Sequence, residues 1–408
     1  METISLFQNK HFVLGVSGGI AAYKVADLAS KLTQAGALVD VVMTEAATKF
    51  VGPVTFAAVT GRAVQLDADL WRHDQHVPHV QLGEKADLMI IAPATANTLA
   101  KLAHGQADNM LSVVALAARC PIILVPAMDG GMWSNAATQA NVATLRERGF
   151  HVCGPAMGRM ASGLIGEGRM LETPEILGFA RLVLGQHGSF AGKQIVVTAG
   201  GTHEAIDPVR FIGNRSSGKQ GFAIAQAAID RGAEVTLIVG ASALPTPYGA
   251  VRIDVESAQQ MCEAVLTASA NADALIMAAA VADFQATAQA DQKIKKTKDT
   301  IELDLKLVRT PDILQAVKEQ RDKTSRPKVT IGFAAETQNL IDNATTKLHS
   351  KGLDLIVAND VSAHDAGFAV DTNRVTLLDA GGGVEALPIM SKAQVAEHIL
   401  NRLAALLS

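Results

Sequence analysis

Two glycine-rich turns stand where a strand is expected to give way to a helix, and both are suited to hold a phosphate. The first turn, Ser17–Gly19, follows the apolar run Phe12–Val16. The second, Thr198–Thr202, follows Ile195–Val197 and leads to another anion-friendly cluster, Ser216–Lys219. Backbone N–H groups in such turns point at an anion. One turn alone is weak support, but two of them, far apart in the chain, predict two α/β domains that each hold a phosphorylated ligand.

Neither turn fits an NAD site. The glycine spacing is not GxGxxG, the fingerprint of dinucleotide binding. An NAD site also needs an acidic residue near the end of the second strand for the ribose hydroxyls. The strands expected at Leu38–Met43 and Glu234–Val239 are followed by Thr44 and Gly240 instead. A two-domain NAD oxidoreductase is therefore disfavoured.

Three histidines three residues apart, His73, His76 and His79, raise the question of a metal site. Pro78 disfavours the helix that would place them on one face. An exposed polar loop is the better interpretation for the first two. His79 differs because it begins a short alternating run, to Leu82, that leads into a helix.

Two continuous apolar runs end in small and polar residues that suit a ligand. Leu88–Ile91 and Ile122–Val125 are continuous rather than alternating, as buried parallel strands are. They are followed by Ala92–Thr98 and Pro126–Trp133, which carry amide, hydroxyl and carboxyl groups. Such residues at the carboxyl end of a strand form a flat ligand site.

Size and composition limit the class of protein. With 408 residues, two or three domains are expected. A net charge of −4 and only 4% aromatic residues give no reason to expect nucleic acid as a partner. Three scattered cysteines form no CxxC pair, so we expect no disulfide framework and a cytoplasmic protein. The N-terminus does not resemble a signal peptide, and no apolar stretch is long enough to span a membrane.

The second half restarts the strand–helix pattern after a boundary rich in glycine and small polar residues, Gly185–Lys193. We therefore expect an α/β fold of two doubly wound, Rossmann-like domains, over residues 1–187 and 188–408. A long loop is expected between the strands at 274–277 and 329–331. The expected strands of the second half are 194–197, 234–239, 274–277, 329–331 and 353–358, and its helices are 222–231, 257–268 and 339–350.

Some polar residues of the second half allow two interpretations. Asp283 follows the small residues after strand 274–277 and could bind a base, a ribose or a metal, or could simply cap a helix. The lysine cluster Lys293–Lys298 is either a solvated surface or a mobile flap that closes on a triphosphate. Lys347 and Lys351 lie four apart on one helix face, where lysines also serve as ordinary C-terminal helix charges.

Several motifs of the first half resemble those of the flavin-dependent cysteine decarboxylases. They are GVSGGIAAYK, MTxxAxxF, PATANT and PAMDGGMW. With TAGGTHEAIDPVRFIGNRSSGKQG, AAAVADF, KIKK, RTPDIL and GFAAET, nearly the whole chain resembles the bifunctional phosphopantothenoylcysteine decarboxylase/phosphopantothenate–cysteine ligases of coenzyme A biosynthesis. The resemblance implies a flavodoxin-like N-terminal domain that binds FMN, a nucleotide-binding ligase domain, and a homo-oligomer of decarboxylase trimers and ligase dimers.

For the first half, the resemblance implies that His79 is a catalytic histidine. It also shows two departures. Asp129 stands where the family has an asparagine that holds the substrate carboxylate, and Ser162 stands where it has a cysteine that donates a proton. We expect both to slow decarboxylation without abolishing it. The implied FMN-binding residues are Gly15, Ser17, Gly18, Gly19, Thr44, Pro93, Ala94, Thr95 and Asn97.

For the second half, the resemblance implies CTP-dependent activation of 4′-phosphopantothenate as an acyl-cytidylate, followed by attack of the cysteine amine. Asn214 is implied to stabilise the acyl intermediate, and Lys293 to support cytidylate formation. Mg²⁺ is expected with the triphosphate, at Asp283. The implied substrate residues are Asp207, Arg210, Asn214, Ser216, Ser217, Gly218 and Lys219. The implied CTP residues are Met277, Ala278, Ala279, Asp283, Lys293, Pro311, Asp312, Ile313, Leu314, Phe333, Lys347 and Lys351.

The sequence thus predicts an enzyme that makes and decarboxylates phosphopantothenoylcysteine. One alternative is a ligase whose flavin-binding half is weak or inactive as a decarboxylase. A second, from another class, is a non-catalytic flavin-binding module. An FMN spectrum of the purified protein would separate this enzyme from an NAD oxidoreductase. CTP-dependent pyrophosphate release that needs both 4′-phosphopantothenate and cysteine would exclude the binding module.

Overall fold

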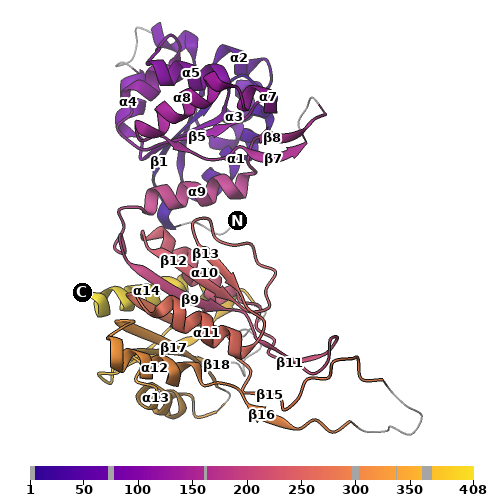
Figure 1. The fold of residues 1–408 in the computed structure, drawn as a ribbon. Coiled ribbons are helices and arrows are strands. Elements are labelled where there is room, and N and C mark those ends of the chain that lie inside the picture. Colours follow the sequence, from indigo (N-terminus) through magenta and orange to yellow (C-terminus); the bar gives the residue numbers. More distant parts are fainter. Residues whose placement is uncertain (1–4, 72–77, 160–162, 296–302, 337, 361–369) are drawn as a thin grey trace. The chain divides into compact units, whose positions relative to one another are not determined.

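The structure is a computed structural model that describes residues 5–71, 78–159, 163–295, 303–336, 338–360 and 370–408. The chain divides into two compact units, residues 1–185 and 186–408 (Figure 1). Each unit is described by itself. None of the helices in the described ranges is both long and apolar enough to cross a membrane.

Unit 1 is built on a six-stranded sheet in the order β3-β2-β1-β4-β5-β6, in which all neighbouring strands are parallel. A hairpin of β7 and β8 projects from it (Figure 1). The strands are β1 (His11–Val16), β2 (Leu38–Met43), β3 (Gln65–Leu66), β4 (Leu88–Ala94), β5 (Ile122–Pro126), β6 (His151–Val152), β7 (Ala156–Arg159) and β8 (Ile165–Arg169). The helices are α1 (Ala22–Gln34), α2 (Glu45–Thr48), α3 (Pro53–Thr60), α4 (Pro78–Lys85), α5 (Ala96–His104), α6 (Met110–Ala117), α7 (Gly130–Trp133), α8 (Ala136–Glu147) and α9 (Thr173–Gly185), with 3₁₀ turns at Ser5–Phe7 and Asp67–Trp71.

Helices cover both faces of this sheet, which explains its continuous apolar strands. Phe12 and Leu14 of β1 belong to a buried cluster with α1 and α9. Val13, which points to the opposite face, belongs to a second cluster with α5, α6 and α8. The sheet is therefore doubly wound, as predicted, and its strand order reverses between β1 and β4. Ligands of such sheets bind at the carboxyl ends of the strands beside this reversal.

One local prediction for unit 1 is wrong, and one element was not predicted. The alternating run predicted from His79 is helical, because Pro78 occupies the first turn of α4 rather than preventing a helix. A proline is tolerated there because the first N–H groups of a helix have no partner within the helix. The β7–β8 hairpin was not predicted, since its glycines interrupt any strand periodicity. His73 and His76 lie outside the described residues.

Unit 2 is built on an eight-stranded sheet in the order β13-β12-β9-β14-β17-β18-β20-β21. Pairing is parallel from β13 to β18 and antiparallel beyond it. The strands are β9 (Gln194–Ala199), β10 (His203–Ala205), β11 (Phe211–Gly213), β12 (Glu234–Val239), β13 (Val251–Asp254), β14 (Ala274–Met277), β15 (Phe284–Ala286), β16 (Leu307–Arg309), β17 (Val329–Glu336), β18 (Leu355–Asp360), β19 (Thr372–Asn373), β20 (Val375–Asp379), β21 (Val384–Ala386) and β22 (Met390–Ser391). The helices are α10 (Lys219–Asp230), α11 (Ala258–Ser269), α12 (Ile313–Thr324), α13 (Leu340–Ser350) and α14 (Lys392–Leu407).

The second doubly wound domain is confirmed, but the predicted long loop is wrong in part. Residues 313–324 form α12, whose start is capped by the Asp312 side chain, and α12 packs with α11 in one buried cluster. The sequence analysis also omitted β20 and α14. The latter begins with a capping box in which Ser391 and Gln394 each bond to the other's backbone, a pattern readable from the sequence.

Candidate active sites

Unit 1 contains a cavity of about 1080 Å³ at the carboxyl ends of β1, β4 and β5. A cavity of this size is at the upper end of those that hold small molecules and cofactors. Gly15, Pro93 and Ala94 are not among the residues that line it; they belong to β1 and β4. The predicted residues that do line it are Ser17, Gly18, Gly19, Thr44, Thr95, Asn97 and Asp129.

The turn after β1 is shaped for close approach of an anion. A Cβ atom at Gly18 would lie 2.4 Å from the Cβ of Ala46, so only glycine fits against α2. Helix α1 begins after Ala21, and no side chain caps its first N–H groups. Uncapped N–H groups at the start of a 13-residue helix attract a phosphate. This turn therefore fits the phosphate of FMN.

Ser17 joins the two loops that flank the strand reversal. Its side chain is buried, and its hydroxyl donates a hydrogen bond to the Pro93 carbonyl at 2.6 Å. The backbone N–H of Thr95 donates to the same hydroxyl at 3.3 Å. The hydroxyl thus fixes the distance between the turn after β1 and the turn after β4.

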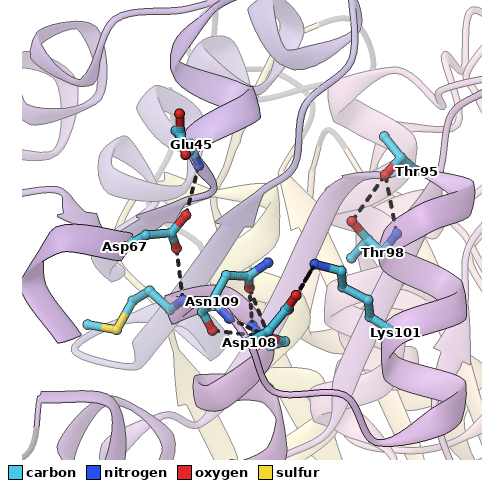
Figure 2. A network of polar contacts seen from close by, with 9 residues as sticks. Glu45, Asp67, Thr95, Thr98, Lys101, Asp108 and Asn109 are labelled. Atoms are coloured by element: carbon cyan, nitrogen blue, oxygen red, sulfur yellow. Dashed lines mark hydrogen bonds and ion pairs between the residues drawn. The ribbon is translucent and has the colours of Figure 1, made fainter.

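A network of polar contacts holds another part of the cavity wall (Figure 2). The Asp67 carboxylate accepts hydrogen bonds from the backbone N–H groups of Glu45, at 3.0 Å, and Met110, at 2.8 Å. These groups open α2 and α6, where a carboxylate also interacts favourably with the helix dipole. Asn109 caps α6, and Lys101 is paired with Asp108 at 2.8 Å. Asp67 therefore links the starts of two helices beside the cavity.

Asp129 is positioned by the chain around α7. Its side chain accepts a hydrogen bond from the Gly131 N–H at 3.0 Å and so caps this short helix. The backbone N–H of Met128 donates to the Gly168 carbonyl in β8 at 2.9 Å. The Trp133 indole N–H donates to Glu167 of β8 at 3.2 Å. Asp129 therefore lies beside the root of the β7–β8 hairpin, whereas Ser162 lies outside the described residues.

A shared carboxylate holds the same hairpin from the other side. Glu172 pairs with Lys24 of α1 at 2.9 Å and with Arg169 of β8. The hydrogen bond from Lys24, with the charges of both partners, lowers the pKa of Glu172 although burial opposes the shift. Lys24 and Arg169 both line the cavity, so their charges are partly neutralised there.

The structure does not bring His79 into this cavity. It lies in the first turn of α4 and is not among the cavity-lining residues. Its Nδ1 atom is buried and has no hydrogen-bond partner among the described residues. A buried imidazole nitrogen without a partner is costly, which suggests that a further group satisfies it in the working protein.

In unit 2 the corresponding strand reversal lies between β9 and β14, and the loops after these strands are joined. The Ala280 N–H donates to the Gly200 carbonyl at 2.8 Å, and the Thr202 N–H donates to the Ala280 carbonyl at 3.2 Å. The Asn214 side chain donates to the same carbonyl at 3.0 Å. Asn214 is exposed, so its carboxamide lies at the surface of this edge.

Asp207 is occupied by internal bonds. It is 2% exposed, and its carboxylate accepts the N–H groups of Val209, Arg210 and Ile294 and pairs with the Arg210 guanidinium at 2.9 Å. Burial raises its pKa, but these donors outweigh burial and hold the pKa below its usual value. Asp207 therefore holds the segment next to Lys293, an exposed residue, rather than presenting a free carboxylate to a substrate.

The helix α10 begins with a second anion-friendly turn. Gly218 has φ +81° and no side chain to cap the helix, and the Ser216 hydroxyl accepts the Gly218 N–H at 3.4 Å. Ser217 is held through its carbonyl, which accepts a hydrogen bond from the Ser242 hydroxyl at 3.0 Å. The sequence expectation of an anion-binding cluster at Ser216–Lys219 therefore has a matching geometry.

Lys392 stands beside this turn and was missed by the sequence analysis. It is 6% exposed, and its ammonium donates to the Val370 carbonyl at 2.6 Å. Burial and the charge of Lys219 lower its pKa to about 8. Lys219 itself pairs with Asp371 at 2.6 Å. The capping box of α14 locates Lys392 at a helix start, but nothing in the sequence brings it next to Lys219.

Most of the predicted CTP residues lie at the same edge of the sheet. Met277, Ala278 and Ala279 end or follow β14, and Phe333 lies in the neighbouring β17. Lys347 donates to the Phe333 carbonyl at 2.9 Å. Lys351 pairs with Asp312, the cap of α12. Burial alone would raise the pKa of Asp312, but the hydrogen bond from Lys351 outweighs burial, so the pKa of Asp312 is lowered. Pro311 precedes this cap, and Ile313 and Leu314 form the first turn of α12.

Asp283 is exposed and follows the β14 loop. Its carbonyl accepts the Thr310 N–H at 3.0 Å, so it lies close to the start of the α12 region. Among the described residues, no group of three or more His, Cys, Asp or Glu side chains could hold a metal ion. A cation at Asp283 would therefore depend on oxygens supplied by a ligand such as a triphosphate.

Together, the two sheets and their edges define a two-domain α/β protein with a cofactor-sized cavity in one unit and, in the other, a helix start after Gly218 that no side chain caps. Two family models match the chain: Flavoprotein, over residues 3–184, and DNA/pantothenate metabolism flavoprotein C-terminal domain, over residues 190–407.

Relatives match along the full length. The coenzyme A biosynthesis bifunctional protein CoaBC of Vibrio vulnificus (strain CMCP6) is 44% identical over 407 residues, covering 100% of both chains. CoaBC of Mycobacterium tuberculosis (strain ATCC 25618 / H37Rv) is 46% identical over 413 residues, covering 98% of this chain and 97% of its own. The chain therefore belongs to the CoaBC family, and it is a bifunctional decarboxylase and ligase of coenzyme A biosynthesis.

Solved structures match each unit separately. The C-terminal domain of a CoaBC protein is 41% identical, covers 54% of this chain and 98% of its own, and has a TM-score of 0.46. A PPC decarboxylase mutant complexed with pantothenoylaminoethenethiol is 33% identical, covers 43% of this chain and 98% of its own, and has a TM-score of 0.40.

Proposed function

We propose that unit 2 joins 4′-phosphopantothenate to cysteine at the expense of CTP, and that unit 1 decarboxylates the product with FMN to give 4′-phosphopantetheine. The observation that carries this proposal is the gathering of the predicted residues at one edge of each sheet. In unit 1 seven of them, Ser17, Gly18, Gly19, Thr44, Thr95, Asn97 and Asp129, line one cavity next to a turn that fits a phosphate. In unit 2 they follow β9, β14 and β17, neighbours in one sheet.

In the ligase reaction, the substrate carboxylate attacks the α-phosphoryl group of CTP, and pyrophosphate leaves. The cysteine amine then displaces CMP from the acyl-cytidylate and forms the amide. Lys293 neutralises charge on the transferring phosphoryl group, and Asn214 donates a hydrogen bond to the acyl intermediate. The Ser216–Lys219 turn holds the phosphate of the pantothenate, and Mg²⁺ at Asp283 accompanies the triphosphate.

In the decarboxylase reaction, FMN supplies the oxidation of the substrate thiol and the later reduction of the decarboxylated product. The oxidised thiol is an electron sink that allows CO₂ to leave. The protein orients the substrate in the cavity, and a side chain must donate the final proton. We assign Thr44, Thr95 and Asn97, which line the cavity, to the cofactor, and Asp129, which lines it next to the root of the hairpin, to the substrate.

We further propose that a homo-oligomer completes the decarboxylase site. His79 is implied as a catalytic residue by the sequence motif, yet it does not line the cavity of its own chain. Its buried Nδ1 has no partner among the residues that the structure describes, so a hydrogen-bonding group must come from elsewhere. A neighbouring copy of the chain that brings its His79 to this cavity would meet both conditions.

Turnover of 4′-phosphopantothenoylcysteine by the FMN-loaded protein tests the decarboxylase, with CO₂ and the mass of the thiol product as readouts. Formation of 4′-phosphopantetheine by the natural chain supports the proposal. Complete turnover only in Ser162→Cys or Asp129→Asn would show that unit 1 has lost a step. For the ligase, pyrophosphate release over many turnovers must require CTP, 4′-phosphopantothenate and cysteine together, because cysteine is needed to displace CMP and free the site for the next turnover. Sustained pyrophosphate release without cysteine would contradict the proposal.

A further inference from the structure

The cavity of unit 1 carries more positive side chains than one phosphate requires. Five cationic residues line it: Lys24, Lys49, Lys101, Arg159 and Arg169. Lys24 and Arg169 share Glu172, and Lys101 pairs with Asp108. Within the described residues, no acidic side chain lies at ion-pair distance from Lys49 or Arg159. These two cations are therefore available to ligands.

Lys49 and Arg159 belong to different parts of the cavity wall. Lys49 directly follows α2, the helix on which Gly18 packs, and so it belongs to the side of the phosphate turn. Arg159 is the last residue of β7 in the projecting hairpin (Figure 1). The hairpin root is bonded to the segment of Met128 and Asp129. Arg159 lies at the other end of β7 from this root, and it lines the same cavity as Asp129.

The charge of Asp129 constrains which ligand can bind beside it. Asp129 places a carboxylate on the cavity wall, and a carboxylate repels an anionic ligand unless a cation is near. The cysteinyl substrate carries a free carboxylate that it loses in the reaction. A guanidinium stays protonated at all relevant pH values and binds a carboxylate through two parallel hydrogen bonds.

Two further contacts give the hairpin a fixed position. Trp133 donates to Glu167, and Arg169 pairs with Glu172, so the middle and the last residue of β8 are tied to the body of unit 1. Gly158 is closely packed on Arg169, since a Cβ atom there would lie 2.9 Å from the Arg169 Cδ. Arg159 thus extends from a strand that is supported by polar contacts and by packing.

We propose that Arg159 binds the free carboxylate of the cysteinyl substrate and offsets the charge of Asp129. This inference deepens the proposed decarboxylase function and rests on it. Arg159 is a specificity-determining residue for substrates that carry a carboxylate next to the reacting carbon, whereas Lys49 lies on the side of the cofactor phosphate.

The experiment measures ligand binding without turnover. N-(4′-phosphopantothenoyl)serine carries a hydroxyl in place of the thiol, so it keeps the carboxylate but lacks the group that is oxidised. N-(4′-phosphopantothenoyl)ethanolamine lacks the carboxylate, and N-pantothenoylserine lacks the phosphate. Each is titrated into the FMN-loaded full-length protein, and the change of flavin absorption reports the dissociation constant.

We expect Arg159→Gln to weaken binding of both serine compounds about 5- to 10-fold, the effect of losing one charge-assisted contact at a partly exposed site. Binding of the ethanolamine compound should not change, and Arg159→Lys should recover part of the affinity. Arg146→Gln, which removes an exposed arginine of α8 outside the cavity, is the matched control and should change nothing.

Equal losses for the serine and ethanolamine compounds would overturn the inference, because Arg159 would then contact a part that both share. A loss confined to the two phosphorylated compounds would assign Arg159 to the phosphate and would also overturn it. Unchanged binding of all three compounds to Arg159→Gln would likewise overturn the inference. If binding depends on Arg159 but the natural chain releases no CO₂ from 4′-phosphopantothenoylcysteine, the decarboxylase proposal fails while the carboxylate contact stands.

Discussion

Replacing Asp67 by asparagine tests whether one carboxylate holds the wall of the flavin cavity. Each of its oxygens accepts one backbone N–H, from Glu45 and from Met110 (Figure 2). Asparagine has nearly the same shape but only one accepting oxygen. In Asp67→Asn, one helix start therefore loses its acceptor and faces the amide NH₂ group, and both helix dipoles lose a negative charge.

The size of the effect follows from these contacts. A hydrogen bond to a charged group contributes about 1.5–3 kcal/mol, and the partial exposure of Asp67 places the loss near the lower value. We expect Asp67→Asn to lower the free energy of unfolding of unit 1 by about 1–2 kcal/mol. For a unit of this size that corresponds to a fall in Tm of roughly 2–8 °C.

The assay is the release of FMN on heating the full-length protein, followed by flavin fluorescence. FMN should also bind more weakly to Asp67→Asn, since the starts of α2 and α6 both belong to the cavity wall. Asp108→Asn is the matched control. The Asp108 side chain is 61% exposed, and Lys101 is the one cation that pairs with it within the described ranges, so the Tm of this variant should fall by no more than about 2 °C. Equal effects of the two substitutions on Tm and on FMN affinity would refute a special role of Asp67.

Three further predictions concern other parts of the molecule. Asp129→Asn should keep the cap of α7, since Asn135 caps α8 in the same way, so the Tm should stay constant. The KM for 4′-phosphopantothenoylcysteine should fall several-fold, and an unchanged KM would argue against repulsion between Asp129 and the substrate carboxylate. Gly221→Ala should destabilise unit 2 by about 1–3 kcal/mol in urea unfolding, because its Cβ would lie 2.6 Å from the Ala199 Cβ, and a neutral effect would contradict this packing. The pKa of Lys392 is lowered to about 8 from a usual 10.5, so between these pH values the unfolded chain binds more protons than the folded chain. The free energy of unfolding of unit 2 should therefore rise with pH over this range, by up to about 3 kcal/mol. Lys392→Met should flatten the rise, and an equally steep rise in that variant would assign the rise to another group.

The sequence predicts the sheets well where apolar residues run without interruption. The strands expected at Leu38–Met43, Glu234–Val239 and Ala274–Met277 match the structure residue for residue. Each is largely buried, and its short length of four to six residues favours a strand over a buried helix. By contrast, the hairpin around Arg159 was missed because its strands are short, exposed and rich in glycine.

The candidate sites were predictable only where a local motif carries the chemistry. The turns at Ser17–Gly19 and Ser216–Lys219 have readable glycine and hydroxyl patterns. Asp67, Arg159 and Lys392 were not found, because their roles depend on contacts between residues far apart in the sequence. Asp67, for example, acts through a backbone N–H 43 positions away. No periodicity or spacing records such a contact.

The hydrogen bonds of Asp207 affect how much conformational entropy the chain next to Lys293 loses when a ligand binds. Both polar backbone groups of Ile294 are engaged: its N–H donates to Asp207 at 3.1 Å, and its carbonyl accepts from Arg210 at 3.2 Å. The main chain next to Lys293 is therefore ordered when unit 2 folds. If Lys293 contacts a triphosphate as proposed, binding does not have to order the backbone at Ile294, which would cost about 1–2 kcal/mol per residue; it has to order the lysine side chain, which loses up to about 2 kcal/mol of rotamer freedom. The entropy of this piece of backbone is thus lost when unit 2 folds rather than when the ligand binds.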